Sequence, residues 1–193
     1  MIVMKFGGTS VGDAACITNA AEIVKQTAEG QGPVVVVVSA ISGVTDRLVE
    51  AAEAASRRED SRCSSIRDEL FAKHRSAVVG VASDVGRAIV VLDEIGKLLD
   101  EFVHLCRSIS VLGELTPRGL DVVSSFGERM AVKICAEALV KQGLKAEAID
   151  ASELIITDDQ FGNATPLMKL TTERVRKRIL PLLQQGIVPV VTG

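Results

Sequence analysis

A short polar segment near the amino terminus carries the residues best suited to phosphate chemistry. Lys5 lies in a β-rich run, and the glycine pair Gly7 and Gly8 ends that run. Glycines let a backbone approach a phosphate closely, and a lysine held on a strand adds a full positive charge. Thr9 and Ser10 add hydroxyl groups that could also cap the next helix. The lysine precedes the glycines, so this is neither a Walker A loop nor a dinucleotide fingerprint. A plain strand–helix turn with an exposed lysine is the alternative.

A second polar turn, from Ser39 to Asp46, leaves a run of five valines and enters the next predicted helix. Ligands of open α/β sheets bind where strands give way to helix amino termini, because unpaired amide groups there favour anions. The small and hydroxylated residues of this turn, Ser39 and Thr45 among them, suit a pocket for a carboxylate. Ordinary helix capping by Ser42 or Thr45 would explain the same residues.

A third segment, from Ser124 to Arg129, places a carboxylate at the edge of a predicted helix. The apolar residues that follow recur at helical spacing and form a core stripe. Glu128 begins near the edge of that stripe, where it could bind an ammonium group. An exposed or ion-paired glutamate is the alternative interpretation.

Hydrophobic periodicity predicts the elements that must position these three segments. We expect a strand, helix and strand at residues 2–6, 17–28 and 34–38, which together form a right-handed β-α-β unit. The five valines of the second strand are typical of a central parallel strand that is buried on both faces. Further elements are predicted as helices at 120–142 and 166–185 and strands at 145–149 and 187–192.

Residues 46 to 112 read as two or three charged helices, with weak breaks near residues 57–61 and 82–84. The final strand, around Val188 to Val191, has no later neighbour in the sequence. We therefore expect the chain to be a truncated part of a larger α/β fold. If that strand is exposed at the edge of the sheet, self-association into a homo-oligomer should follow, because unpaired edges recruit partners.

Composition excludes several classes of function. The 193 residues are 47% hydrophobic and 24% charged, and the net charge of −3 is spread along the chain, so neither nucleic acid nor an anionic membrane is an expected partner. There is no Trp or Tyr to stack on bases. The four cysteines are too widely spaced for a zinc site or a disulfide framework, so we predict no metal site and a cytoplasmic location. The longest apolar run is too short to span a bilayer.

Taken together, the three polar segments resemble, in order and separation, the signature segments of aspartate kinases. Lys5 to Val11, with the sequence KFGGTSV, is the most specific of them, and the resemblance covers essentially the whole chain. It implies membership of the amino acid kinase family and a three-layer α/β/α sandwich with a mainly parallel central sheet. Residues 1–193 would then be the amino-terminal part of a catalytic domain. The ATP-binding part and the ACT regulatory domains of the family would lie outside this chain.

The resemblance also implies roles for individual residues. Lys5 would be catalytic and contact the transferring phosphate, and four residues would shape the phosphate-facing loop, namely Gly7, Gly8, Thr9 and Ser10. Ser39 and Thr45 would line the aspartate site. Glu128 would bind the substrate through its α-amino group, whereas Arg129 has no assigned role.

The implied reaction transfers the γ-phosphoryl group of ATP, carried with Mg²⁺, to the side-chain carboxylate of L-aspartate. This carboxylate is already ionised at neutral pH, so no general base is needed, and His74 and His104 are expected to be surface or structural residues. Intact activity of the isolated chain is not expected. Another family member, of the glutamate 5-kinase or uridylate kinase type, is one alternative. A non-catalytic module that binds a metabolite or forms an interface is the other.

Overall fold

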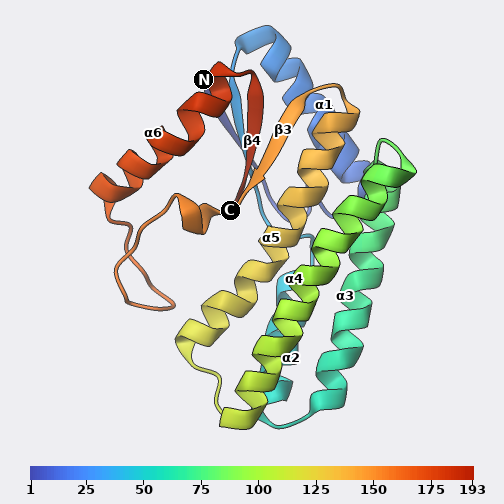
Figure 1. Ribbon diagram of the computed structural model, residues 1–193, viewed down its shortest axis with the longest axis vertical. Coiled ribbons are helices and arrows are strands. Elements are labelled where there is room, and N and C mark those ends of the chain that lie inside the picture. Colours follow the sequence, from blue (N-terminus) through green and yellow to red (C-terminus); the bar gives the residue numbers. More distant parts are fainter.

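Four parallel strands form the central sheet of the computed structural model, which describes residues 1–193 (Figure 1). Their spatial order is β1-β2-β4-β3, with bounds β1 Ile2–Phe6, β2 Val34–Val38, β3 Lys145–Ile149 and β4 Ile187–Thr192. The helices are α1 Ala14–Gln31, α2 Val44–Ser56, α3 Asp60–Val81, α4 Val85–Leu112, α5 Pro117–Lys141 and α6 Met168–Gln184. None of them combines the length and the apolar character that crossing a membrane requires.

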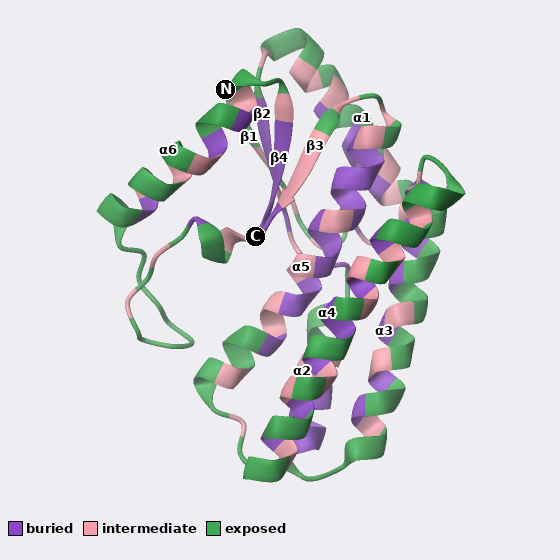
Figure 2. Ribbon diagram, viewed as in Figure 1, coloured by how far each residue is buried: buried purple, intermediate pink, exposed green.

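The valine run of β2 explains the three layers. Val34, Val36 and Val38 face the large core that α1 to α5 build on one side of the sheet. Val35 faces a smaller core on the other side, where Ile179 and Leu182 of α6 pack. Side chains of a strand alternate between its faces, so an unbroken valine run fills both cores. The predicted three-layer α/β/α fold with a parallel sheet is confirmed. Figure 2 shows the mostly buried strands β2 and β4 between helices whose outer faces are exposed.

The first helix begins at Ala14, three residues before its predicted start, and an aspartate caps it. Asp13 is the residue before α1, and its carboxylate accepts a hydrogen bond of 2.8 Å from the amide of Cys16. The expectation that Thr9 or Ser10 could cap this helix is therefore wrong. An aspartate satisfies the free amide groups of a first turn as well as a hydroxyl does, so Thr9 and Ser10 remain in the loop before α1.

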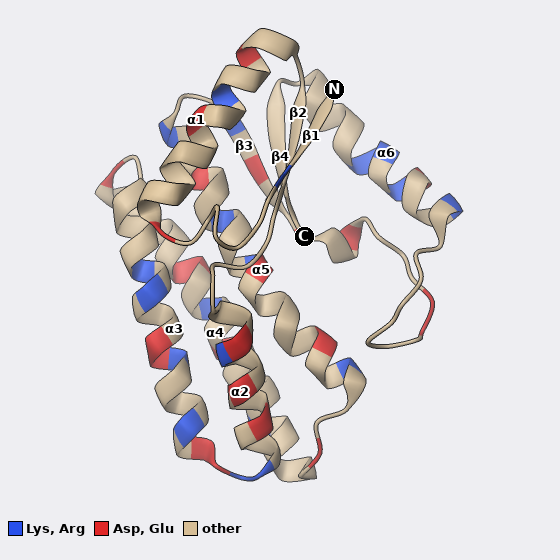
Figure 3. Cartoon of the chain, turned by 180° about the vertical axis from the view of Figure 1, so that it is seen from behind, with Lys and Arg blue, Asp and Glu red and all other residues tan.

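The segment between residues 46 and 112 forms three helices, α2, α3 and α4, whose exposed faces carry charges of both signs (Figure 3). Glu137 of α5 fastens the turn between α3 and α4. Its buried carboxylate, 1% exposed, accepts hydrogen bonds from the amide and hydroxyl of Ser83 and from the guanidinium of Arg87. Burial alone would raise the pKa of Glu137, but these donors outweigh it and the pKa is lowered.

The last strand occupies the interior of the sheet, which corrects the expectation of an exposed final strand. β4 pairs with β2 on one side and with β3 on the other, so the edges of the sheet are β1 and β3. Chain order does not determine strand order in a parallel sheet, because a crossover connection can return to any position. The argument for self-association through the final strand therefore loses its basis.

His74 is a buried polar residue of α3 with one ring nitrogen unsatisfied. Its Nδ1 lies 2.7 Å from the carbonyl oxygen of Leu70, which can only accept, so Nδ1 carries the proton. The other nitrogen, Nε2, is buried without a hydrogen-bond partner. Burial therefore lowers the pKa of His74 to about 4, with a smaller contribution from the charge of Lys73. His74 is structural, whereas His104 lies exposed on α4.

We predict that His74 makes the fold sensitive to acid. The folded pKa of about 4 lies below the ordinary value of 6.5, so the unfolded chain binds the proton more tightly and stability falls as pH drops from about 6.5 to 4. The loss should approach roughly 3 kcal/mol, since each pKa unit corresponds to about 1.4 kcal/mol. Denaturant unfolding of wild type and His74→Leu across this pH range measures it, and the variant should lose less stability.

The control for this experiment is His104→Leu, which removes an exposed imidazole from the neighbouring helix. It should show the same fall in stability as the wild-type chain. Equal pH dependence in the wild type and in His74→Leu would show that His74 does not control the acid response.

Candidate active site at the carboxyl ends of the strands

The candidate site lies at one edge of the sheet, where all four parallel strands end. Lys5 is the penultimate residue of β1, and Ser39 follows β2 directly. Asp150 follows β3 and Gly193 follows β4. Parallel strands present their carboxyl ends at the same edge, so residues from both ends of the chain meet there.

Two glycines press against Ala40, which lies between β2 and α2. A Cβ on Gly8 would lie 2.9 Å from the carbonyl oxygen of Ala40, and one on Gly127 would lie 2.7 Å from the Ala40 Cβ. Both distances are shorter than real side chains tolerate, so the loop after β1 and helix α5 approach Ala40 only because these positions lack side chains. This packing joins the three segments that the sequence analysis singled out.

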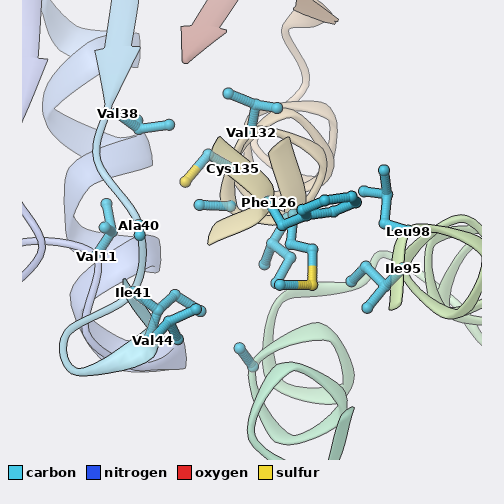
Figure 4. Close-up of a cluster of buried hydrophobic side chains, with 14 of the residues drawn as sticks. Val11, Val38, Ala40, Ile41, Val44, Ile95, Leu98, Phe126, Val132 and Cys135 are labelled. Atoms are coloured by element: carbon cyan, nitrogen blue, oxygen red, sulfur yellow. The ribbon is translucent and has the colours of Figure 1, made fainter. Parts of the chain in front are cut away.

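The loop after β1 is anchored by a buried side chain, and its other face is exposed to solvent. Val11 is fully buried, and Figure 4 shows it beside Ala40. The amide of Ser10 donates to the carbonyl of Gly7 at 2.9 Å, which closes a turn. Gly7 differs from its neighbour Gly8, because nothing lies within 4 Å of the position where its Cβ would be. The open face of Gly7 therefore gives a ligand access to the backbone.

The turn after β2 has no side-chain cap. Gly43 precedes α2 with φ of 76°, and no side chain hydrogen-bonds to the first turn of the helix. The alternative that Ser42 or Thr45 serves as an ordinary cap is thus wrong. Lys73 of α3 holds this turn from outside, where its ammonium group donates to the carbonyl of Ser42 at 2.7 Å. Ser39 is half-buried and Thr45 is exposed.

Glu128 is a half-buried carboxylate that forms no ion pair and accepts no hydrogen bond within the chain, unlike the exposed or ion-paired glutamate of the alternative interpretation. Burial raises its pKa most strongly, the positive charge of Lys5 lowers it, and the negative charge of Asp150 raises it further. The charges of Lys5 and Asp150 therefore both act on the Glu128 carboxylate at this edge of the sheet. Burial of an unpaired carboxylate is costly, which is typical of sites that bind a ligand.

The sequence analysis missed Asp150. Its carboxylate forms a 3.2 Å ion pair with Arg129 and accepts a 2.9 Å hydrogen bond from the amide of Ser152. The signal was present, because Asp150 directly follows a correctly predicted strand, where ligand-binding residues of parallel sheets occur. No three His, Cys, Asp or Glu side chains gather where they could hold a metal ion.

Comparison with known proteins agrees with this geometry. The model of the amino acid kinase family matches residues 1–193, the whole chain. The chain belongs to the amino acid kinase family. Among relatives of this family member, Aspartokinase 2, chloroplastic, of Arabidopsis thaliana is 33% identical over 193 residues, which are 99% of this chain and 34% of the relative. Lysine-sensitive aspartokinase 3 of Escherichia coli is 30% identical over 189 residues, with 97% of this chain and 39% of the relative covered.

A solved structure shares the same arrangement. Escherichia coli aspartokinase III in complex with aspartate and ADP superimposes with a TM-score of 0.87 at 27% identity, and the match covers all of this chain and 40% of that one. The same enzyme in complex with lysine and aspartate gives a TM-score of 0.82 at 28% identity. This member of the amino acid kinase family spans about a third of the length of the curated relatives that it matches.

We predict opposite outcomes for alanine at the two adjacent glycines. Gly8→Ala should lower the free energy of unfolding by about 1–3 kcal/mol, because its Cβ would meet a backbone oxygen that cannot swing aside. Gly7→Ala is the matched control and should change stability by no more than about 0.5 kcal/mol, as expected for open surface positions. Urea unfolding monitored by circular dichroism measures both. Equal losses of unfolding free energy in the two variants would show that the close contact of Gly8 with Ala40 does not determine the cost of the added side chain.

Proposed function

We propose that this chain is the amino-acid-binding part of an aspartate kinase catalytic domain. The reaction is transfer of the ATP γ-phosphoryl group to the side-chain carboxylate of L-aspartate, which leads toward lysine, threonine and methionine. The observation that best supports the proposal is that Lys5 and Ser39 lie where β1 and β2 end, with Thr45 in the first turn of α2 and Glu128 close enough to Lys5 for its charge to act on it. None of these four side chains hydrogen-bonds to the rest of the chain. Unpaired polar groups in that position favour a small zwitterionic ligand.

Each residue then has a physical role. Glu128 binds the α-ammonium group of aspartate, whose positive charge offsets the burial that raises the Glu128 pKa. Ser39 and Thr45 supply hydroxyls beside the uncapped start of α2, where free amides favour the α-carboxylate of the substrate. The substrate therefore binds with its side chain free to react.

Phosphoryl transfer needs charge stabilisation more than proton transfer. The substrate carboxylate is ionised at neutral pH, since its ordinary pKa is about 3.9, and it attacks without a general base. Lys5 stabilises the negative charge that is shared among the transferring phosphate, the attacking carboxylate and the leaving ADP. The open backbone of Gly7 and the exposed hydroxyls of Thr9 and Ser10 face the same phosphate. Mg²⁺ arrives with ATP as part of the substrate complex.

Residues 1–193 would contribute the aspartate pocket, and most nucleotide contacts would come from the segment that the aspartokinase relatives carry beyond the matched third. The solved Escherichia coli relative contains aspartate and ADP together, which supports both substrates for the complete enzyme. ACT regulatory domains, a homo-oligomeric assembly and a cytoplasmic location belong to the same proposal.

We predict that the chain binds L-aspartate. Calorimetric titration should show saturable binding of L-aspartate and little affinity for Mg-ATP. Glu128→Gln should raise the Kd for aspartate about ten- to hundredfold, as expected for loss of a charge-assisted hydrogen bond. Glu22→Gln, at an exposed position of α1, is the control and should bind as the wild type does.

The same titration separates the alternatives. Preferential binding of L-glutamate or of uridine monophosphate would favour a glutamate 5-kinase or uridylate kinase type. Absence of binding to all three ligands would favour an interface module and contradict the proposal. Tight binding of Mg-ATP alone would show that the division between the two substrate sites is misplaced.

The role of Lys5 can be tested in a chimaera. This chain would replace the matching 40% of Escherichia coli aspartokinase III, whose backbone it follows closely. In an active chimaera, Lys5→Ala should lower kcat about a hundredfold or more, as for loss of a principal electrostatic donor. The KM for aspartate should change much less. A kcat within a factor of about two of the parent would remove Lys5 from the catalytic step.

A further inference from the structure

Arg129 follows Glu128 in α5 and contacts two other elements. Its guanidinium forms a 3.2 Å ion pair with Glu101 of α4 and another of 3.2 Å with Asp150 at the end of β3. A single side chain therefore connects α4, α5 and the edge of the sheet. No role followed for Arg129 from the sequence.

The guanidinium is also fixed by stacking. It lies over the ring of Phe126, 4.8 Å from the ring centroid, and Phe126 packs edge-on against the fully buried Phe102 at 5.8 Å. Figure 4 shows Phe126 among the buried side chains of this cluster. The contact with the ring and the two carboxylate partners together hold the guanidinium in place.

Asp150, the partner of Arg129, is itself anchored. The carboxylate oxygen of Asp150 that does not pair with Arg129 accepts a 2.9 Å hydrogen bond from the amide of Ser152. The amide of Ala151, which follows Asp150 in the chain, donates to the hydroxyl of Thr192 at 2.8 Å. The Arg129–Asp150 pair thus ties α5 to the ends of both β3 and β4. Glu128 is the residue before Arg129 in α5 and therefore lies next to this tie.

Neutralisation of Asp150 is a second consequence of the pair. Burial raises the pKa of Glu128, Lys5 opposes this, and the charge of Asp150 adds to it. Arg129 lies between Asp150 and Glu101 and offsets their negative charge. The charged groups near Glu128 and Arg129, in the middle of α5, are Lys5 of β1, Asp150 after β3 and Glu101 of α4.

We propose that Arg129 is a positioning residue that holds the Glu128 carboxylate opposite Lys5 by bracing α5 against Asp150 and Glu101. The inference rests on the proposed function, because it gives Arg129 a purpose in the binding of the substrate ammonium group. Partly exposed ion pairs contribute little to global stability, so the free energy of unfolding is a poor measure of this role. The pKa of Glu128 and the affinity for L-aspartate are the quantities that test it.

The first test needs no ligand. NMR titration of the ¹³C-labelled glutamate carboxyl groups, with Glu128 assigned from Glu128→Gln, follows the Glu128 pKa in the wild type and in Arg129→Gln. We expect a rise of about half a unit or more in the variant, since the charge of Asp150 is no longer offset. An unchanged Glu128 pKa would overturn the proposal.

The second test measures binding of L-aspartate by calorimetry. Arg129→Gln should raise the Kd about tenfold, with a chain that still unfolds cooperatively. Addition of Asp150→Asn should bring the Glu128 pKa back toward the wild-type value but leave the Kd raised, because the charge is removed while the brace stays broken. Recovery of both quantities, or an unchanged Kd in Arg129→Gln, would overturn the positioning role.

Arg178→Gln is the matched control. Arg178 also bridges two carboxylates, Glu147 and Glu153, but does so from α6 on the opposite face of the sheet. Its loss should affect the melting temperature as Arg129→Gln does and change neither the Glu128 pKa nor the Kd. A wild-type chain that binds no L-aspartate would defeat the proposed function, whereas the NMR titration, which needs no ligand, would still show whether Arg129 offsets the charge of Asp150 at Glu128.

Discussion

The close approach of two glycines to Ala40 is the constraint on which the site depends. Gly8 lies in the loop after β1, and Gly127 precedes Glu128 in α5. Any side chain at either position would push its element away from the turn after β2, because the facing atoms belong to backbone or to a Cβ that has no freedom to move. Three polar segments, far apart in the sequence, are therefore held together by the absence of side chains.

The parallel sheet brings the polar turns to a single edge. Each strand returns through a crossover, so all four carboxyl ends and the helix starts that follow them lie on the same side. The unequal cores reinforce this arrangement. Five helices pack on one face of the sheet and α6 covers the other (Figure 1). The polar turns follow the carboxyl ends of the strands, and Val11, Ala40 and Ile41 anchor them in the larger core.

Charged groups are treated differently at this edge and elsewhere. Glu137 is almost completely buried and has three donor groups from Ser83 and Arg87, as the burial of a charge requires. Lys5 and Glu128 have no such partners, although they lie near each other. The half-buried Glu128 keeps an unpaired carboxylate at a cost in stability, whereas the exposed Lys5 is solvated. Arg129 shows the intermediate case, since it is fully engaged in the structure and acts, in our proposal, on the residue beside it.

The sequence by itself determined the fold class, the positions of the strands and helices, and the three polar segments, because hydrophobic period and glycine placement are local signals. The tertiary structure alone decided that β4 is interior and that Asp13, not a hydroxyl, caps α1. It also revealed Asp150 and the contacts of Arg129. These features depend on which elements become neighbours. Crossover connections can place a strand at several positions, and only packing of the whole chain selects one of them.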